Sequence, residues 1–189
     1  MWCFQKNAVA VAVAIPPVAE EFRIWTGAGL VFTNGDLILC GYEPHKKIPA
    51  IYGIGGKRES TDITYYHTAF REAFEEILGV GPPVGLIGAL AGAARSQKTV
   101  KVGGGYIMIQ YSFVDLVRFL DIMRRAGVRM PLYTKAPRTV EDLLLRRLCH
   151  ASTEMTHLCV LPVVRPAPIV SRDLAGDIEG IVKQNRLPQ

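Results

Sequence analysis

The sequence lacks several features that would place it in a special class. It has no apolar run of roughly 18 residues, so we expect no membrane-spanning helix. It has no internal repeat, low-complexity tract or linker, which indicates one domain spanning 1–189. Its four cysteines form no C-x-x-C pair, and we expect free, buried thiols in the reducing cytoplasm.

Charge of one sign is only mildly in excess. The net charge is +5 and the pI is about 9.1, which does not by itself indicate nucleic-acid binding but helps to attract a polyanionic substrate. Hydrophobic residues make up 49% of the chain, enough for a folded core. Cys149, His150, His157 and Cys159 could form a zinc site, but this spacing fits no common zinc finger.

Hydrophobic periodicity and turn residues predict a mixed α/β chain. Strands are expected at 8–15, 22–25, 29–32, 37–42, 51–54, 86–91, 106–113 and 156–164. Helices are expected at 63–78, 115–126, 140–150 and 171–185. Residues 33–36 (TNGD) indicate a hairpin turn, and 91–105 is a glycine-rich basic connection. The apolar run 8–15 could also be the core of a signal peptide, although the prolines and glutamates after it favour a strand.

Three glutamates gather on one face of the helix predicted at 63–78. At about 100° per residue, Glu72, Glu75 and Glu76 lie opposite the apolar face. Like charges at this spacing destabilise an isolated helix by roughly 0.2–0.5 kcal/mol per pair, and a divalent cation removes that penalty. Carboxylates without Cys or His partners suit Mg²⁺ or Mn²⁺. The alternative is an ordinary solvated helix face.

A glycine-rich loop, 55–59 (GGKRE), precedes this helix. Glycines let backbone carbonyls and amides come close to an ion or a phosphate. Lys57 either contacts a phosphate or lies in solvent. Thr61 or Asp62 is expected to cap the helix, and Gly79 is expected to end it.

Loop and helix together resemble the Nudix box, whose pattern is G-x5-E-x7-R-E-U-x-E-E-x-G-U with U apolar. The second half of the pattern matches Arg71, Glu72, Ala73, Glu75 and Glu76, followed by a glycine and an apolar residue. Two residues instead of one precede the closing glycine. One extra residue also separates Gly56 from Arg71, and Asp62 stands where the pattern has glutamate.

The resemblance implies an α/β/α sandwich with a mixed sheet and extra helices, formed by a single Nudix hydrolase domain. It implies hydrolysis of a pyrophosphate bond in a nucleoside-diphosphate-linked substrate with Mg²⁺ or Mn²⁺. The implied metal ligands are the Gly55 carbonyl, Glu72, Glu75 and Glu76. Glu72 and Glu76 are also implied as catalytic residues.

Two further roles depend on the same resemblance. Arg71 is expected to hold the loop through Glu59 or Asp62 rather than to contact the substrate. The general base in this family is a box glutamate or an acid from a distant loop. Glu154 is the first outside candidate and Glu141 the second.

The substrate is the most open part of the prediction. The chain is loosely similar to mRNA-decapping Nudix enzymes of large cytoplasmic DNA viruses. That similarity implies capped mRNA, cleaved to 7-methylguanosine diphosphate and 5′-monophosphate RNA, in the host cytoplasm if the protein is viral. Arg95 and Lys98 would then bind phosphates, and Trp25 would stack on the base. The alternatives are a hydrolase of free nucleotides and a non-catalytic binding module. The oligomeric state is open.

Overall fold

The structure is a computed structural model and describes residues 24–95, 97–101, 103–150, 153–164, 170–176 and 178–179. The strand predicted at 8–15 lies outside the described residues. So do the start of the strand predicted at 22–25 and the end of the helix predicted at 171–185.

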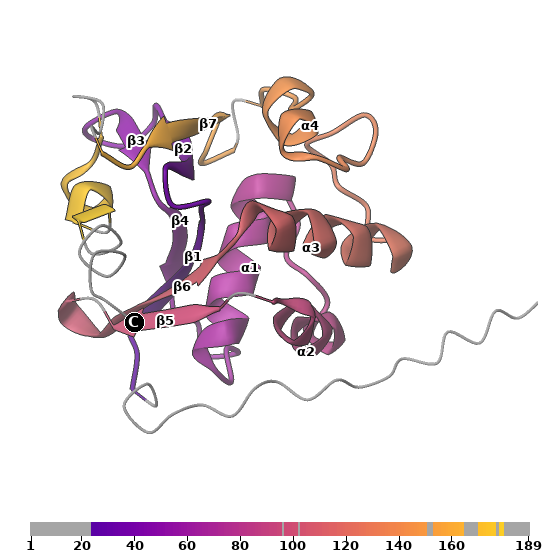
Figure 1. Cartoon of the computed structure of the whole chain (residues 1–189), viewed down its shortest axis with the longest axis horizontal. Coiled ribbons are helices and arrows are strands. Elements are labelled where there is room, and N and C mark those ends of the chain that lie inside the picture. Colours follow the sequence, from indigo (N-terminus) through magenta and orange to yellow (C-terminus); the bar gives the residue numbers. More distant parts are fainter. Residues whose placement is uncertain are drawn as a thin grey trace, which may run out of the picture.

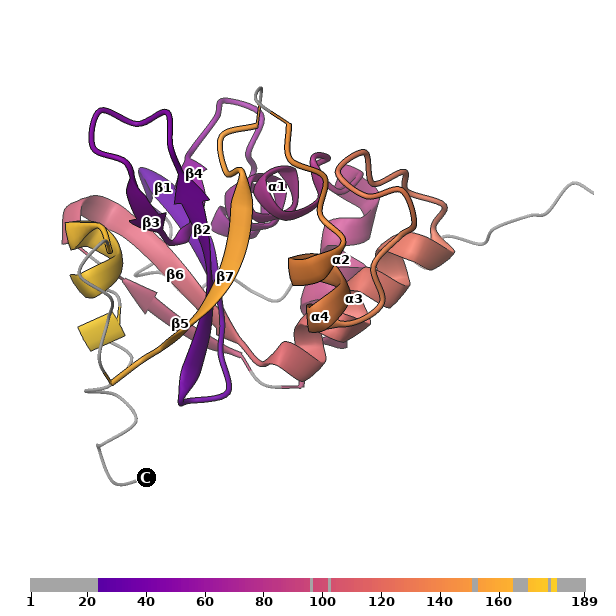
Figure 2. The same ribbon diagram turned by 90° about the horizontal axis from the view of Figure 1, so that it is seen from above.

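Two β-sheets form the centre of the molecule (Figures 1 and 2). The first has the order β4 (Ile54–Lys57), β1 (Gly27–Phe32), β6 (Tyr106–Tyr111) and β5 (Lys98–Lys101). In it β1 and β6 are parallel and the other pairs antiparallel, so this sheet is mixed as expected. The second sheet has the antiparallel order β3 (Ala50–Tyr52), β2 (Leu37–Glu43) and β7 (His157–Pro162). The hairpin turn at 33–36 joins β1 to β2 and thereby links the two sheets.

Helices lie on both sides of the four-stranded sheet. The helices are α1 (Tyr65–Leu78), α2 (Val84–Ala93), α3 (Phe113–Arg125) and α4 (Val140–Leu145), and a short 3₁₀ turn η2 (Gly103–Gly105) precedes β6. Figure 1 shows α1, α2 and α3 on one side of this sheet and the helical residues 172–176 on the other. Leu174 of that stretch packs in a core cluster with Val31 and Met108. The expected α/β/α layering is therefore present.

An aromatic cluster joins the sheet to the helices. The ring of Phe119 on α3 lies 5.1 Å from that of Tyr111 and 5.4 Å from that of Phe70. Phe32 and Phe74 complete the cluster, and all five rings are buried. Edge-to-face packing of this kind fixes α1 and α3 relative to β1 and β6.

The long acidic helix is confirmed, with a different start. It begins at Tyr65 and is capped by Thr64, not by Thr61 or Asp62. The carboxylate of Asp62 is unavailable because it accepts hydrogen bonds from the Glu59 amide, Thr68 and Arg71. Gly79 ends the helix as predicted, with the left-handed φ of 77° that favours glycine.

The strand predicted at 86–91 is wrong, because these residues belong to helix α2. The segment is apolar on all sides, and a short apolar run of this kind does not distinguish a strand from a buried helix. Helix α2 packs against α1 and α3, which bury Ile87 and Leu90.

Other boundaries also differ from the predictions, and Ile24 and Trp25, the described part of the strand predicted at 22–25, are not in a strand. Helix α4 ends at Leu145 rather than at 150, because Arg147 turns inward to bond backbone carbonyls. The strand predicted at 51–54 is two strands, β3 and β4. The glycine-rich connection at 91–105 contains strand β5, which pairs with β6.

Candidate functional site

Arg71 is the centre of the network that fixes the glycine loop to α1. Its guanidinium group lies 2.9 Å from Asp62 Oδ2 and donates a 3.0 Å hydrogen bond to the Lys57 carbonyl. It is also 3.0 Å from Glu72 Oε1, 3.4 Å from Glu75 and 3.5 Å from Glu59. Arg71 therefore holds the loop through carboxylates, and Asp62 is the closer of the two partners that were predicted.

The loop glycines have specific steric roles. Gly55 has a φ of +144°, and a Cβ there would lie 2.3 Å from Gly29 Cα, so only glycine fits. A Cβ on Gly56 would lie 2.5 Å from Glu72 Oε2, so the missing side chain makes room for that carboxylate. The Gly55 amide donates a 2.8 Å hydrogen bond to Glu76 Oε2. The loop and the helix carboxylates thus meet directly.

Two acids from outside the helix join this region. Glu43, at the end of β2, is only 2% exposed, and Glu154 lies in the segment before β7. The ammonium group of Lys46 lies 3.0 Å from Glu43 Oε2 and 3.4 Å from Glu154 Oε1, so it bridges the two. We use the name carboxylate cluster for Glu43, Glu72, Glu76 and Glu154. Sequence reasoning missed Glu43, and its only signal was an acid at the end of an apolar strand.

The pKa shifts show that these carboxylates influence one another. Burial raises the pKa of Glu76 well above its ordinary value; the Gly55 amide opposes this, and the charges of Glu43, Glu72 and Glu154 add to it. Burial also raises the pKa of Glu72, with Arg71 opposing and Glu75 and Glu154 adding. Neighbouring acids that raise one another's pKa in this way are characteristic of functional sites.

This donor set fits a hard divalent cation. It consists of oxygen ligands, and Glu43 Oε2 is buried and accepts no well-directed hydrogen bond although Lys46 is near. Within the described residues, however, no three acidic, cysteine or histidine side chains are already arranged as a metal cluster. Glu72 and Glu75 turn towards Arg71, and Glu76 turns towards the Gly55 amide, so the helix acids have other partners here.

A second arginine connects the segments that carry two of these acids. Arg147 donates hydrogen bonds from its guanidinium group to the carbonyls of Glu76 and Ile77 at the end of α1, and to that of Met155. Met155 directly follows Glu154. The Arg147 side chain thus satisfies carbonyls that the end of α1 leaves without partners within the helix.

The remaining predicted site residues are Lys57, Arg95, Lys98 and Trp25, and Lys57 directly follows Gly56, which makes room for Glu72. Lys57 is exposed at the end of β4. Arg95 and Lys98 are also exposed, and they line a polar pocket of about 610 Å³ with Gln110 and Ser112. Trp25 is 7% exposed, its indole N–H bonds Thr68, and the Arg58 guanidinium stacks on its ring. Trp25 is thus a core residue in this structure.

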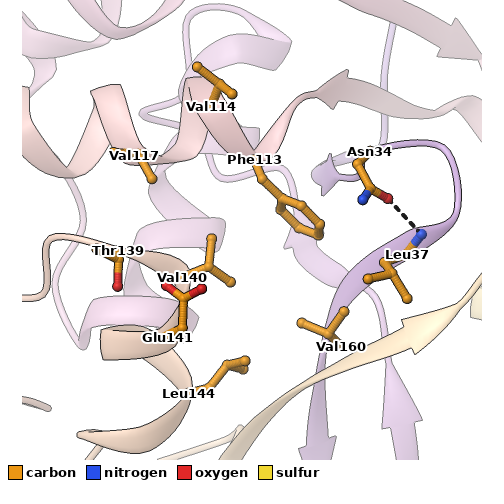
Figure 3. Close-up of a pocket in the computed structure, with 10 residues that line it drawn as sticks. All are labelled: Asn34, Leu37, Phe113, Val114, Val117, Thr139, Val140, Glu141, Leu144 and Val160. Carbon is orange, nitrogen blue, oxygen red and sulfur yellow. Dashed lines mark hydrogen bonds between the residues drawn. The ribbon is translucent and has the colours of Figure 1, made fainter.

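A second pocket, of about 520 Å³ and largely apolar, is lined by Glu141, the second candidate base. Figure 3 shows it between β2, β7, α3 and α4, with Phe113 and Leu37 among its walls and Glu141 at one side. Leu37 and Glu43 are at opposite ends of β2, about 20 Å apart for a rise of roughly 3.3 Å per residue. Glu141, the second candidate base, therefore lies far from the carboxylate cluster.

The cysteines show no assembled zinc site among the residues that the structure covers. Cys149 Sγ lies 3.2 Å from His157 Nε2, while Cys159 faces Cys40 across the β2–β7 pair. The described cysteines are free thiols, but only Cys40 is buried; Cys149 is exposed, unlike the expectation. No helix in the described ranges is long and apolar enough to cross a membrane.

Comparison with known proteins gives only distant likenesses. No protein-family model matches the chain, and no curated protein sequence matches it. One similar solved structure is a bifunctional NMN adenylyltransferase/ADP-ribose pyrophosphatase from Francisella tularensis, complexed with AMP and a manganese ion. It has a TM-score of 0.45 and 13% identity, over 86% of this chain and 42% of that one. This chain thus spans less than half of that protein.

A MutT Nudix hydrolase from Burkholderia pseudomallei gives a TM-score of 0.39 at 15% identity, over 81% of this chain and 94% of that one. The solution structure of the E. coli ORF135 protein gives a TM-score of 0.23 at 18% identity, over 46% of this chain and 56% of that one. Likenesses this weak say nothing about the activity of this chain.

Proposed function

We propose that the chain is a metal-dependent hydrolase of the Nudix type, which cleaves a pyrophosphate bond in a nucleoside-diphosphate-linked substrate. The observation that carries the proposal is the glycine loop bonded to Glu76, beside a carboxylate cluster drawn from α1, the end of β2 and the segment before β7. The Arg71–Asp62 pair holds this loop against the helix. A mere solvated helix face does not need these contacts.

In this proposal each residue has a stated task. Glu72 and Glu76 bind Mg²⁺ or Mn²⁺, with Glu75 and the Gly55 carbonyl as the other ligands of the box. The ion, when bound, offsets the charge of the pyrophosphate oxygens and activates a water molecule. Arg71 orients the loop and does not contact the substrate.

Glu154 is our candidate for the general base. It is 63% exposed, so it can reach solvent, and its charge contributes to the raised pKa of both Glu72 and Glu76. An acid that is open to water and adjacent to the helix carboxylates is suited to accept a proton from the attacking water. Glu141 is not retained, because it lies by the apolar pocket at the far end of β2.

For the substrate we propose capped mRNA, cleaved to 7-methylguanosine diphosphate and 5′-monophosphate RNA. The support is the net charge of +5 together with the polar pocket that Arg95 and Lys98 line, which offers two cations to a phosphate chain. Stacking of the base on Trp25 is not part of this proposal, because Arg58 covers its ring. Location in the cytoplasm, and in the host cytoplasm for a viral protein, stays a prediction.

The test is a substrate panel with products identified by mass. The panel contains cap-labelled RNA, free cap, ADP-ribose, dinucleoside polyphosphates and nucleoside triphosphates, each with Mg²⁺ or Mn²⁺. We expect release of 7-methylguanosine diphosphate from RNA. Turnover of free nucleotides without release from RNA would reassign the protein to nucleotide housekeeping. Binding without metal-dependent turnover of any substrate would make it a binding module.

Glu76→Gln is the variant that tests the site itself. We expect it to lower the rate by roughly three orders of magnitude or more while the protein remains folded, because it removes a metal-binding charge. Asp121→Asn is the matched control, since Asp121 is an acid on α3 whose ion pairs within the described residues are with Arg124 and Arg125. Full activity of Glu76→Gln would refute the assignment of the metal site.

A further inference from the structure

Glu43 is a buried carboxylate whose charge is balanced by a single ion pair in the described part of the chain. Its side chain is 3% exposed, and its partner is the Lys46 ammonium group, three residues along the chain. Burying a carboxylate is unfavourable unless a cation or several hydrogen bonds compensate it. No hydrogen-bond donor with good geometry serves Glu43 Oε2 within the described residues. Glu43 Oε2 therefore depends on Lys46 as its partner.

Lys46 contacts two members of the carboxylate cluster, Glu43 and Glu154. Its Nζ also lies 3.4 Å from Glu154 Oε1, and 4.8 Å from the centre of the Tyr52 ring, whose face attracts a cation. Burial lowers the pKa of Lys46, but the charges of Glu43 and Glu154 outweigh this and raise it, so the group stays positively charged. The neighbouring Glu76 interacts electrostatically with the same two acids.

We propose that Glu43 is a further metal-binding carboxylate, and that Lys46, although 43% exposed, is the cation that balances its charge until a divalent ion takes that place. This inference rests on the proposed function, because it concerns the same site. In the metal-free protein the ammonium group prevents repulsion between Glu43 and Glu154. When a divalent cation binds, the two positive charges compete for the same oxygens. Lys46 thus sets the metal concentration at which the site fills.

The adjacent Lys47 provides a matched control. Lys46 and Lys47 lie in the same loop between β2 and β3 and carry the same charge. Both lysines are exposed, but the structure records ion pairs for Lys46 and none for Lys47 among the residues it covers. A general effect of net charge will appear equally in both variants, whereas competition for the carboxylates will appear only at Lys46.

The test is Mn²⁺ binding to the whole protein, measured by titration calorimetry. We expect Lys46→Met to bind Mn²⁺ about tenfold more tightly, because a positive charge a few ångströms from a divalent ion is removed. Lys47→Met should change the Kd by less than about twofold, since Lys47 forms no ion pair with these carboxylates in the described residues and salt screens its more distant charge. Lys46→Arg, which keeps the charge, should resemble the wild type. Glu43→Gln should weaken binding about tenfold through loss of a ligand.

The double variant Lys46→Met/Glu43→Gln gives the decisive comparison. With Glu43 neutral, removal of Lys46 should tighten binding by less than about threefold, because the main group for which it competes has lost its charge. If Lys46→Met alone folds only when Mn²⁺ is added, this also supports the proposal, because the ion then replaces the missing cation. If Lys46→Met does not fold even with Mn²⁺, the double variant is the test. A double variant that folds and binds Mn²⁺ as Glu43→Gln does supports the proposal. A double variant that does not fold, or binds differently from Glu43→Gln, refutes it.

The results distinguish a failure of this inference from a failure of the proposed function. A wild-type protein that binds Mn²⁺ and hydrolyses its substrate, together with a Lys46→Met variant that binds no more tightly, overturns only the role of Lys46 and Glu43. An equal effect of Lys47→Met overturns it in the same way. A wild-type protein that binds no divalent ion overturns both this inference and the proposed function.

Discussion

Replacement of Arg71 by methionine tests the network that fixes the glycine loop. The substitution keeps much of the aliphatic stem and removes a guanidinium group that is 17% exposed and pairs with Asp62, which is 4% exposed. Removing one partner of a buried pair costs about 3–5 kcal/mol. Asp62 keeps its hydrogen bonds from the Glu59 amide and Thr68, so we expect a loss near the lower limit, about 3 kcal/mol at pH 7.

The pH dependence gives this prediction a definite sign. Burial alone would raise the pKa of Asp62, but hydrogen bonds from Arg71, the Glu59 amide and Thr68, with the charge of Arg71, lower it overall. A lowered pKa in the folded state means stability that is present above the unfolded pKa of about 3.9 and is lost as the pH falls through the folded pKa. The stability difference between wild type and Arg71→Met should therefore be full at pH 7 and shrink in acid.

Urea unfolding followed by circular dichroism measures these differences. Arg124→Met is the control, because Arg124 forms a surface pair with Asp121 on α3 and should cost only about 0–1 kcal/mol. In an Asp62→Asn background, Arg71→Met should cost clearly less than in the wild type. A loss below about 1 kcal/mol, or an equal loss in the Asp62→Asn background, would refute the reasoning.

Three other predictions follow from the packing and the charges. Gly55→Ala should lose at least about 2 kcal/mol more stability in urea unfolding than Gly35→Ala, because Gly35 also has a positive φ but open space for a Cβ; equal losses would contradict this. Phe119→Ala should lose about 4 kcal/mol of stability by the same assay, since it leaves a cavity among four other aromatic rings; a loss under about 1 kcal/mol would mean that the cluster is not formed. The raised pKa of Glu76, due first to burial, means that the folded protein holds this proton more tightly than the unfolded chain does. In metal-free buffer, wild-type stability should therefore fall relative to that of Glu76→Gln as the pH rises above about 4.3, and parallel pH profiles would refute this.

The fold could be predicted from the sequence wherever one local signal was sufficient. The hairpin turn at 33–36, the acidic helix with its closing Gly79 and the strand that begins at Tyr106 all carry such signals. Helix α2 does not, because its buried surroundings hide the helical period in a uniformly apolar stretch. The end of α4 was also beyond local reasoning, since Arg147 is drawn inward by carbonyls from two distant segments.

The candidate site divides in the same way. The loop, the helix acids and the Arg71–Asp62 contact were accessible because they lie within one short stretch of sequence. Glu154 was proposed only from its place before a strand, and its charge contributes to the raised pKa of Glu72 and Glu76. Glu43 and Lys46 could not be found, because their relation to Glu76 exists only after β2 has been placed beside β7.

The position of Arg147 has a mechanical consequence for the site. The planar guanidinium group of Arg147 hydrogen-bonds both to the last turn of α1 and to the backbone next to Glu154, and so connects these two segments. The backbone segments that carry Glu76 and Glu154 are consequently held together by the protein itself before any ligand binds. A lysine at 147 has one compact ammonium group instead of a planar guanidinium, so we expect it to lose the simultaneous hydrogen bonds to both backbone segments.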